Sequence, residues 1–103
     1  MTENEFNELA DAVFNRIEQG IDASGADIEC NLNGPVLELE FADGSQIVIN
    51  RHAPNREIWL AAKSGGFHYA LQDELWMSRR DGSELFGKLG ELVRLGSGKT
   101  VAF

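Results

Sequence analysis

The spacing of apolar residues changes twice along this chain, and this change constrains the fold more than any other feature. In residues 3–20 apolar side chains recur every three or four positions, the period of one helix face. From residue 27 to residue 79 they alternate with polar side chains, the period of a half-buried strand. Residues 81–98 return to helical spacing. The sequence therefore predicts a helix, a series of strands and a second helix.

Local signals predict where the helices begin and end. Thr2 and Glu5 have the spacing of a capping box at the start of the first helix. Gly20 is expected to end that helix, and a loop should follow it. Asp81 and Glu84 repeat the capping pattern at the start of the second helix.

Short turn sequences ("NGP", "ADGS", "KSGG") separate the strands, so neighbouring strands are expected to pair antiparallel. Two helices on one side of the sheet would bury every apolar face. We expect one α+β domain over residues 1–103, in the order α-β-β-β-β-β-(β)-α with five to six strands. In residues 74–79 two registers remain open: either Leu75 and Met77 face inward, or Trp76 and Ser78 do.

Acidic residues are concentrated in the first part of the chain. Residues 1–43 hold 11 acidic and one basic side chain, whereas residues 44–103 hold 6 acidic and 8 basic ones, so the net charge of −8 divides into −10 and +2. This balance argues against nucleic acid as a partner and favours cations or basic protein surfaces. No stretch approaches the roughly 20 apolar residues of a membrane span, and the acidic N-terminus lacks the features of a secretory signal. We expect a cytoplasmic protein with no membrane association.

Carboxylates recur along the first predicted helix at helical-face spacings and form an acidic stripe. Its members are Glu8, Asp11, Glu18 and Asp22, and Asp27 and Glu29 extend it if the first strand lies beside the helix. Oxygen ligands suit hard cations such as Ca²⁺, Mg²⁺, Mn²⁺ and ferric iron, and ferrous iron less well. The alternative interpretation is an ordinary solvated helix face.

Catalytic motifs are weak in this sequence. Cys30 is the only cysteine, so no internal disulfide or CxxC motif exists, and we expect it to be a buried small apolar residue. His52 and His68 have no evident nucleophile beside them. "GSGKT" at residues 96–100 resembles the end of a phosphate-binding loop, but Val93 occupies the position of the required first glycine. We therefore expect a protein that is not an enzyme.

Trp59 is the one large aromatic residue at a position predicted to face water. If Ile58 and Leu60 point into the core, alternation places Trp59 on the open face of the sheet. Asn50, Arg51, His52 and, on the next strand, His68 are expected to lie near it. An exposed Trp beside an Arg is typical of a binding surface. The alternative is a register shifted by one residue, which would bury Trp59.

The most specific pattern in the sequence is "INRHAPNREIWLA" followed by "KSGGFHYAL". It occurs together with "EFNELAD", "DIECNLNGPVLELEF" and Trp76 before "RRDGSELF". Together these segments resemble the bacterial frataxin (CyaY) family, and the resemblance covers nearly the whole chain. The chain departs from the family pattern at Gln19 and Ala23, where many members have acidic doublets, at Asn7, often a histidine, and at His52, commonly a Gln.

The resemblance implies an iron-binding regulator of iron–sulfur cluster assembly that binds the cysteine desulfurase and scaffold protein and is a proposed iron donor. It places the acidic metal ridge on Glu8, Asp11, Glu18, Asp22, Asp27 and Glu29. It places partner contacts on Glu18, Asp22, Asn50, Arg51, Pro54 and Trp59. A monomer is expected, with iron-induced oligomers as an alternative state. Two other functions remain open: an iron-storage or ferroxidase-type oligomer, and an acidic adaptor without a metal.

Overall fold

The computed structural model describes residues 1–103 and contains two α-helices, six strands and one 3₁₀ turn. In chain order the elements are α1 (Glu3–Ser24), β1 (Ile28–Asn33), β2 (Val36–Phe41), β3 (Gln46–His52), η1 (Ala53–Asn55), β4 (Glu57–Ala62), β5 (Gly65–Gln72), β6 (Leu75–Ser78) and α2 (Leu85–Ser97).

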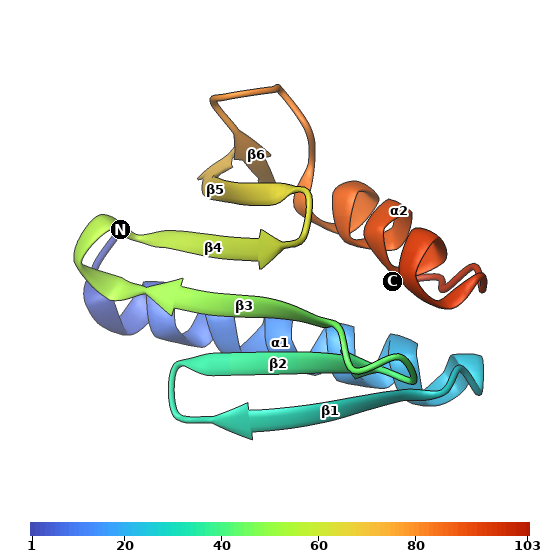
Figure 1. Cartoon of the computed structure of the whole chain (residues 1–103). Coiled ribbons are helices and arrows are strands. Elements are labelled where there is room, and N and C mark those ends of the chain that lie inside the picture. The colour runs from blue at the N-terminus through green and yellow to red at the C-terminus, as the bar shows by residue number, and fades with distance from the viewer.

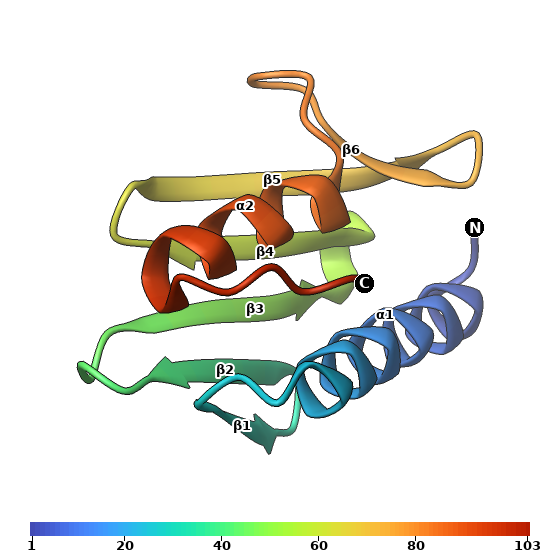
Figure 2. The same cartoon turned by 90° about the vertical axis from the view of Figure 1, so that its right-hand side faces the viewer.

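The six strands form one sheet in the order β1-β2-β3-β4-β5-β6, and every neighbouring pair is antiparallel. Both helices cover the same face of this sheet, as Figure 1 and the turned view in Figure 2 show. The predicted fold is therefore confirmed, with six strands. No helix is long and apolar enough to cross a membrane.

The register of β4 agrees with the alternation in the sequence. Ile58 and Leu60 are buried, and Trp59 between them is half-buried on the opposite face. In β6 the structure selects the second of the two open registers, because Trp76 and Ser78 are buried while Leu75 is exposed. The large indole fills space under the helices that the smaller Leu75 would leave empty.

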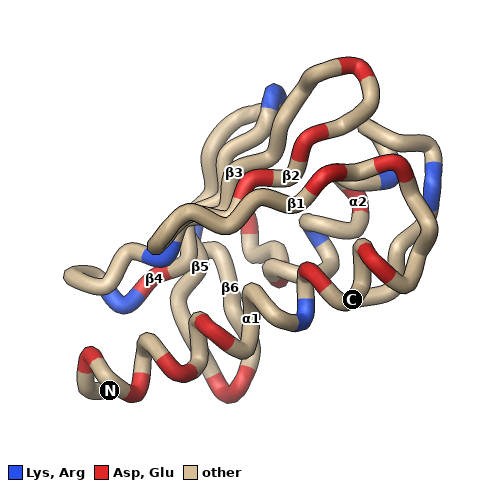
Figure 3. The backbone as a smooth tube through the Cα atoms, turned by 90° about the horizontal axis from the view of Figure 1, so that it is seen from below, with Lys and Arg blue, Asp and Glu red and all other residues tan.

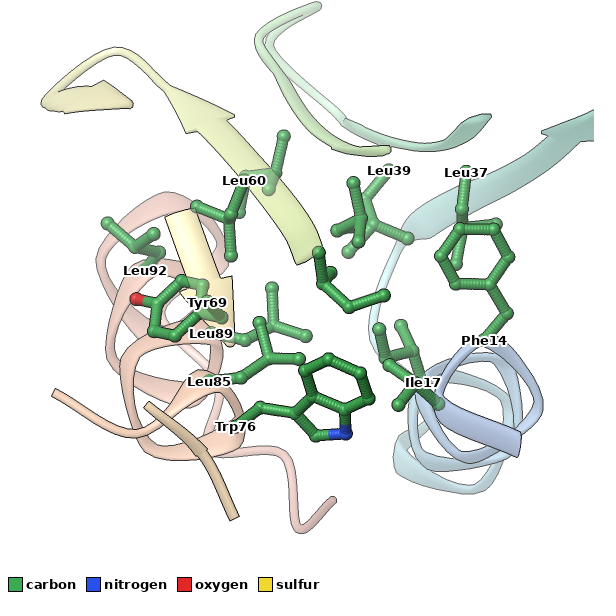
Figure 4. Packing of buried hydrophobic residues seen from close by; sticks show 14 of the residues in the cluster. Phe14, Ile17, Leu37, Leu39, Leu60, Tyr69, Trp76, Leu85, Leu89 and Leu92 are labelled. Carbon is green, nitrogen blue, oxygen red and sulfur yellow. The ribbon is translucent and has the colours of Figure 1, made fainter. Parts of the chain in front are cut away.

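One cluster of 20 buried apolar residues joins the inner face of the sheet to both helices (Figure 4). Trp76 occupies the region between the helices, and the ring of Phe6 from α1 meets it edge to face with centroids 6.1 Å apart. Leu85 and Leu89 contribute from α2, and Ile17 from α1. Because the whole core lies on one side of the sheet, the other side remains open to solvent.

The N-terminal end of α1 was predicted correctly and its C-terminal end was not. Thr2 and Glu5 form the expected capping box, with hydrogen bonds of 3.0 and 3.1 Å between side chains and backbone amides. The helix continues through Gly20 and ends at Ser24, where Gly25 adopts φ 68°. Gly20 has a packing role instead, because a Cβ there would lie 2.8 Å from the Phe103 ring. A conformation with positive φ marks the real end.

The predicted cap of α2 was also wrong. Glu84, not Asp81, caps the helix, since its carboxylate accepts hydrogen bonds from the Phe86 and Gly87 amides at 2.8 and 3.0 Å. Asp81 instead accepts from the amide and hydroxyl of Ser83, which closes the preceding turn. A carboxylate that caps the local turn is no longer available to the helix.

The last residues of the chain run back between the two helices without forming a strand (Figure 2). Val101 is buried in the core, and the Phe103 ring lies 6.5 Å from that of Phe86. The Phe103 carbonyl accepts a 2.8 Å hydrogen bond from Nε of Arg16 on α1. This segment therefore connects α1 to α2. Its Phe103 ring occupies the space that a side chain at position 20 of α1 would need.

Candidate functional site

The acidic stripe lies along the solvent side of α1, and Figure 3 marks acidic positions along α1 and on β1. Glu8, Asp11 and Asp22 are exposed, and Glu18 is half-buried. No hydrogen bond fixes any of these four carboxylates except the contact of Asp11 described below. They therefore form a surface of negative charge that is open to solvent and largely without internal partners.

A hollow of about 540 Å³ lies where the C-terminal half of α1 meets β1. Glu18 and Asp22 line one side of it, and Ile28 and Cys30 line the other. Partial burial raises the pKa of the Cys30 thiol. The Glu18 and Asp22 carboxylates raise this pKa further, because their negative charges disfavour the negative thiolate. Cys30 is thus half-buried rather than fully buried as expected, and the two predicted ridge residues lie together beside it.

Asp11 is held by an internal cation. Its carboxylate lies 2.6 Å from a guanidinium nitrogen of Arg51, whose side chain is 15% exposed against 66% for Asp11. The same guanidinium lies 4.7 Å from the centre of the Phe14 ring. Arg51 therefore fastens β3 to α1, and any cation that binds Asp11 must compete with it.

Asp27 and Glu29 are exposed. Ile28 and Cys30 pack toward the core, so Glu29 points to the opposite face of the sheet, where it is paired across the strands with Glu40. No three side chains of the His, Cys, Asp or Glu type lie close enough together to hold a metal ion. The ridge can attract hydrated cations by charge, and its assignment as a metal site stays a prediction.

The open face of the sheet carries a stack of three aromatic rings. His52, Trp59 and His68 lie on β3, β4 and β5, with ring centroids 4.0 and 4.2 Å apart and planes within 6° and 8° of parallel. The indole Nε1 donates a 2.8 Å hydrogen bond to the Glu57 carboxylate. Trp59 is therefore held in one orientation by both neighbouring strands.

Of the predicted partner contacts outside α1, Asn50 lies beside this stack and Arg51 does not. Asn50 is directly opposite Trp59 on β3, and Pro54 is exposed in η1. Arg51 is opposite the buried Ile58, so its side chain points to the helix side, away from Trp59. The structure thus brings Asn50 and Trp59 together and separates Arg51 from them.

Comparison with known proteins identifies the family. A family model described as "Frataxin-like domain" matches residues 1–99. The chain belongs to the frataxin-like family.

Similar proteins carry one shared description. The chain is 46% identical over 101 residues to "Iron-sulfur cluster assembly protein CyaY" of Neisseria meningitidis serogroup B, covering 98% of this chain and 94% of that protein. It is 48% identical over 103 residues to the protein of the same name from Chromobacterium violaceum, covering 100% and 98%.

Two solved structures share the fold of this frataxin-like domain. Frataxin from Psychromonas ingrahamii matches with a TM-score of 0.94 and 37% identity, covering 98% of this chain and 96% of that one. A trimeric frataxin from the yeast Saccharomyces cerevisiae, complexed with ferrous iron, matches with a TM-score of 0.73 and 31% identity, covering 92% and 87%.

His52 and His68 were expected to lie near Trp59 in this frataxin-like domain, and the structure confirms that placement, since both rings contact the indole. The stacking of the three rings was not predicted. For His68 the signal was present in the turn length, since the turn "KSGG" pairs Trp59 with His68 once the two strands are aligned. For His52 the alignment depends on the longer link that contains η1, whose conformation is not readable from composition.

Proposed function

We propose that this chain is an iron-binding regulator of iron–sulfur cluster assembly that binds a cysteine desulfurase and its scaffold protein in the cytoplasm. The observation that carries the proposal is the acidic surface of α1, where Glu18 and Asp22 border the hollow next to β1. Family membership supports it, because relatives that match over nearly their full length are named iron–sulfur cluster assembly proteins.

The ridge supplies an electrostatic means of binding a partner. Exposed carboxylates with almost no internal partners would attract a basic groove on the desulfurase and speed association. Such binding would be reversible, and it would weaken as salt screens the charges. The open sheet face, with Trp59 held between two histidine rings, would supply a second contact, to the scaffold protein.

Iron enters this proposal as cargo and modulator. Carboxylate oxygens suit iron ions, but the separated positions of Glu18, Asp22 and Asp11 favour weak binding in which the ion keeps much of its water. A bound ion would compete with a basic partner for the same carboxylates, or bridge them to it. Iron would therefore tune the complex, and the proposal includes delivery of iron to the scaffold.

The proposed role involves no catalysis by this chain. Oxidation of ferrous iron would require carboxylates gathered in a protected site, and those of the ridge are separate and solvent-facing. In this proposal the ridge carboxylates attract a basic surface of the partner, and they do not transfer protons or electrons.

Charge reversal tests the contact surface. The variant Glu18→Lys/Asp22→Lys should weaken binding to the desulfurase by about tenfold or more, measured by biolayer interferometry at low salt. Glu74→Lys/Glu91→Lys is the matched control, because both residues are exposed and the change in net charge is the same. Unchanged binding by the first variant, or equal loss in both, would exclude the ridge as the contact surface.

An oligomeric iron store is the second candidate, and the trimeric yeast frataxin complexed with ferrous iron is the observation that favours it. Size-exclusion chromatography with and without excess ferrous iron separates the two proposals. A regulator should elute as a monomer in both conditions, whereas a store should form larger assemblies with iron. An acidic adaptor without a metal function would bind the desulfurase identically in both conditions.

A further inference from the structure

A second cleft, of about 330 Å³, lies on the open sheet face beside Trp59 and is unlike the acidic hollow in charge. It is lined by Glu57, Gly66, His68, Ala70, Arg79 and Arg80. Gly66 and Ala70 form a floor of small side chains, so a ligand group can approach the backbone closely. Two guanidinium groups stand at its rim.

Strand register aligns this cleft with the aromatic stack. Asn50 pairs with Trp59 and Trp59 pairs with His68, which gives one row of side chains across β3, β4 and β5. Ala70 pairs with Met77, so the same register continued by two residues places Arg79 next to His68. The row therefore runs from an amide through two aromatic rings to an arginine.

The positive charge in the cleft is largely unneutralised. Arg79 is exposed and forms no salt bridge or side-chain hydrogen bond within the chain. Arg80 donates one 3.0 Å hydrogen bond to the Gly66 carbonyl, which orients its guanidinium and leaves other N–H groups free. Glu57 is the only carboxylate in the lining, and Trp59 Nε1 already binds it at 2.8 Å.

The cleft lies far from the Glu18 and Asp22 end of the acidic ridge. Glu18 and Asp22 border β1 and the cleft borders β6, which are the two edge strands. Five strand spacings separate these two carboxylates from the cleft by about 24 Å. This exceeds the Debye length of about 8 Å at physiological salt, so they do not cancel the local attraction of the arginines for an anion. Asp11, which lies over β3, is already paired with Arg51.

We propose that this cleft binds a short acidic segment of a partner protein, with a carboxylate on Arg79 and Arg80 and adjoining apolar atoms on the His68 ring. Guanidinium groups recognise carboxylates through paired N–H donors, which gives the contact both strength and direction. The inference rests on the proposed function, in which the open face of the sheet meets a partner, and it defines the chemistry of that partner's segment.

A protein segment fits this surface better than a nucleic acid. Trp59 has a histidine on each face, so it offers no free face on which a base could stack. Only two arginines line the cleft, and the chain carries a net charge of −8, which would repel a long polyanion. A few carboxylates on a short segment avoid that repulsion.

The isolated chain tests the proposal without the assembly machinery. A capped peptide of alternating glutamate and alanine is titrated into the ¹⁵N-labelled protein, and amide shifts are followed by NMR. We expect the shifts to centre on Gly66, His68, Ala70 and Arg79. Arg79→Glu should weaken binding by about tenfold, Arg79→Gln should have a smaller effect, and Lys99→Glu, an exposed matched control, should leave it unchanged.

Three outcomes would overturn the proposal: no shifts at millimolar peptide, equal loss in the Arg79→Glu and Lys99→Glu variants, or tighter binding of a single-stranded RNA of equal charge at the same residues. Preserved amide dispersion in each variant shows that the fold is intact. The peptide titration contains no desulfurase, so its result does not depend on whether the ridge binds the desulfurase. Likewise, a negative peptide titration would not change the result of the desulfurase-binding experiment.

Discussion

The acidic face of α1 and the open face of the sheet differ in how their side chains are positioned. On α1, Glu18 and Asp22 share a helix face by spacing alone and have no hydrogen-bond partners. On the sheet, pairing of three strands places His52, Trp59 and His68 in contact, with centroids 4.0 and 4.2 Å apart. One surface is an arrangement of charges, and the other has a defined shape.

The two surfaces should therefore respond differently to substitution and to salt. A surface that acts by charge loses affinity gradually as carboxylates are removed and is sensitive to salt. A surface that acts by shape depends on its central anchor and fails when that residue is truncated. Under the proposed function, the two surfaces would bind separate partners through contacts with different physical requirements.

Ile58 and Trp59 are adjacent on β4 and face opposite sides of the sheet, so their substitutions should have different effects. Ile58→Ala should destabilise the protein by about 2–5 kcal/mol, since it leaves a cavity in the core. Trp59→Ala should cost only about 1–2 kcal/mol, from loss of two ring stacks on a half-buried surface, while impairing regulation of cluster assembly. Urea unfolding measures both. A loss from Trp59→Ala as large as that from Ile58→Ala would make Trp59 a structural residue.

A smaller effect tests the electrostatics of the ridge. Burial raises the pKa of the Cys30 thiol above its ordinary value, and the Glu18 and Asp22 charges raise it further. Less thiolate therefore exists at pH 8. Alkylation by iodoacetamide should be several-fold slower than for free cysteine. The rate should rise with pH through the raised pKa. Glu18→Gln/Asp22→Asn should lower the pKa and accelerate the reaction partly, because burial remains.

The matched control for this reaction is Glu74→Gln/Glu91→Gln, which removes two distant charges and should leave the rate unchanged. If neutralising Glu18 and Asp22 had no more effect than the control, the carboxylates would not act on the hollow as described.

The fold was predictable because the spacing of apolar residues is a local property of the sequence, and it indicates directly which face of each element is buried in the core. The helix stripe of α1 and the alternation in β2–β5 each identify a buried face before any tertiary contact is known. Prediction failed where a distant segment decides the outcome. Gly20 resembles a helix end, but it lies inside α1 to make room for Phe103, which is more than eighty positions away.

The candidate site was predictable in the same uneven way. Spacing alone placed Glu18 and Asp22 on one helix face, and alternation alone placed Trp59 on the open face. The direction of Arg51 was missed although alternation indicated it, because Arg51 follows the buried Ile47 and Ile49 on one face of β3 and a charged side chain is not expected there. The stack of His52 on Trp59 could not be predicted in this way, because it depends on how the link that contains η1 aligns β3 with β4.

Regulation through the ridge is tested most directly by measuring cluster assembly that a cysteine desulfurase drives on its scaffold protein. Assembly is followed optically with this chain at stoichiometric amounts, with and without excess ferrous iron. A regulator that works through the ridge should change the rate in an iron-dependent way, and Glu18→Lys/Asp22→Lys should abolish the change while Glu74→Lys/Glu91→Lys preserves it. An assembly rate that is the same with and without this chain at every iron concentration would contradict the proposed function.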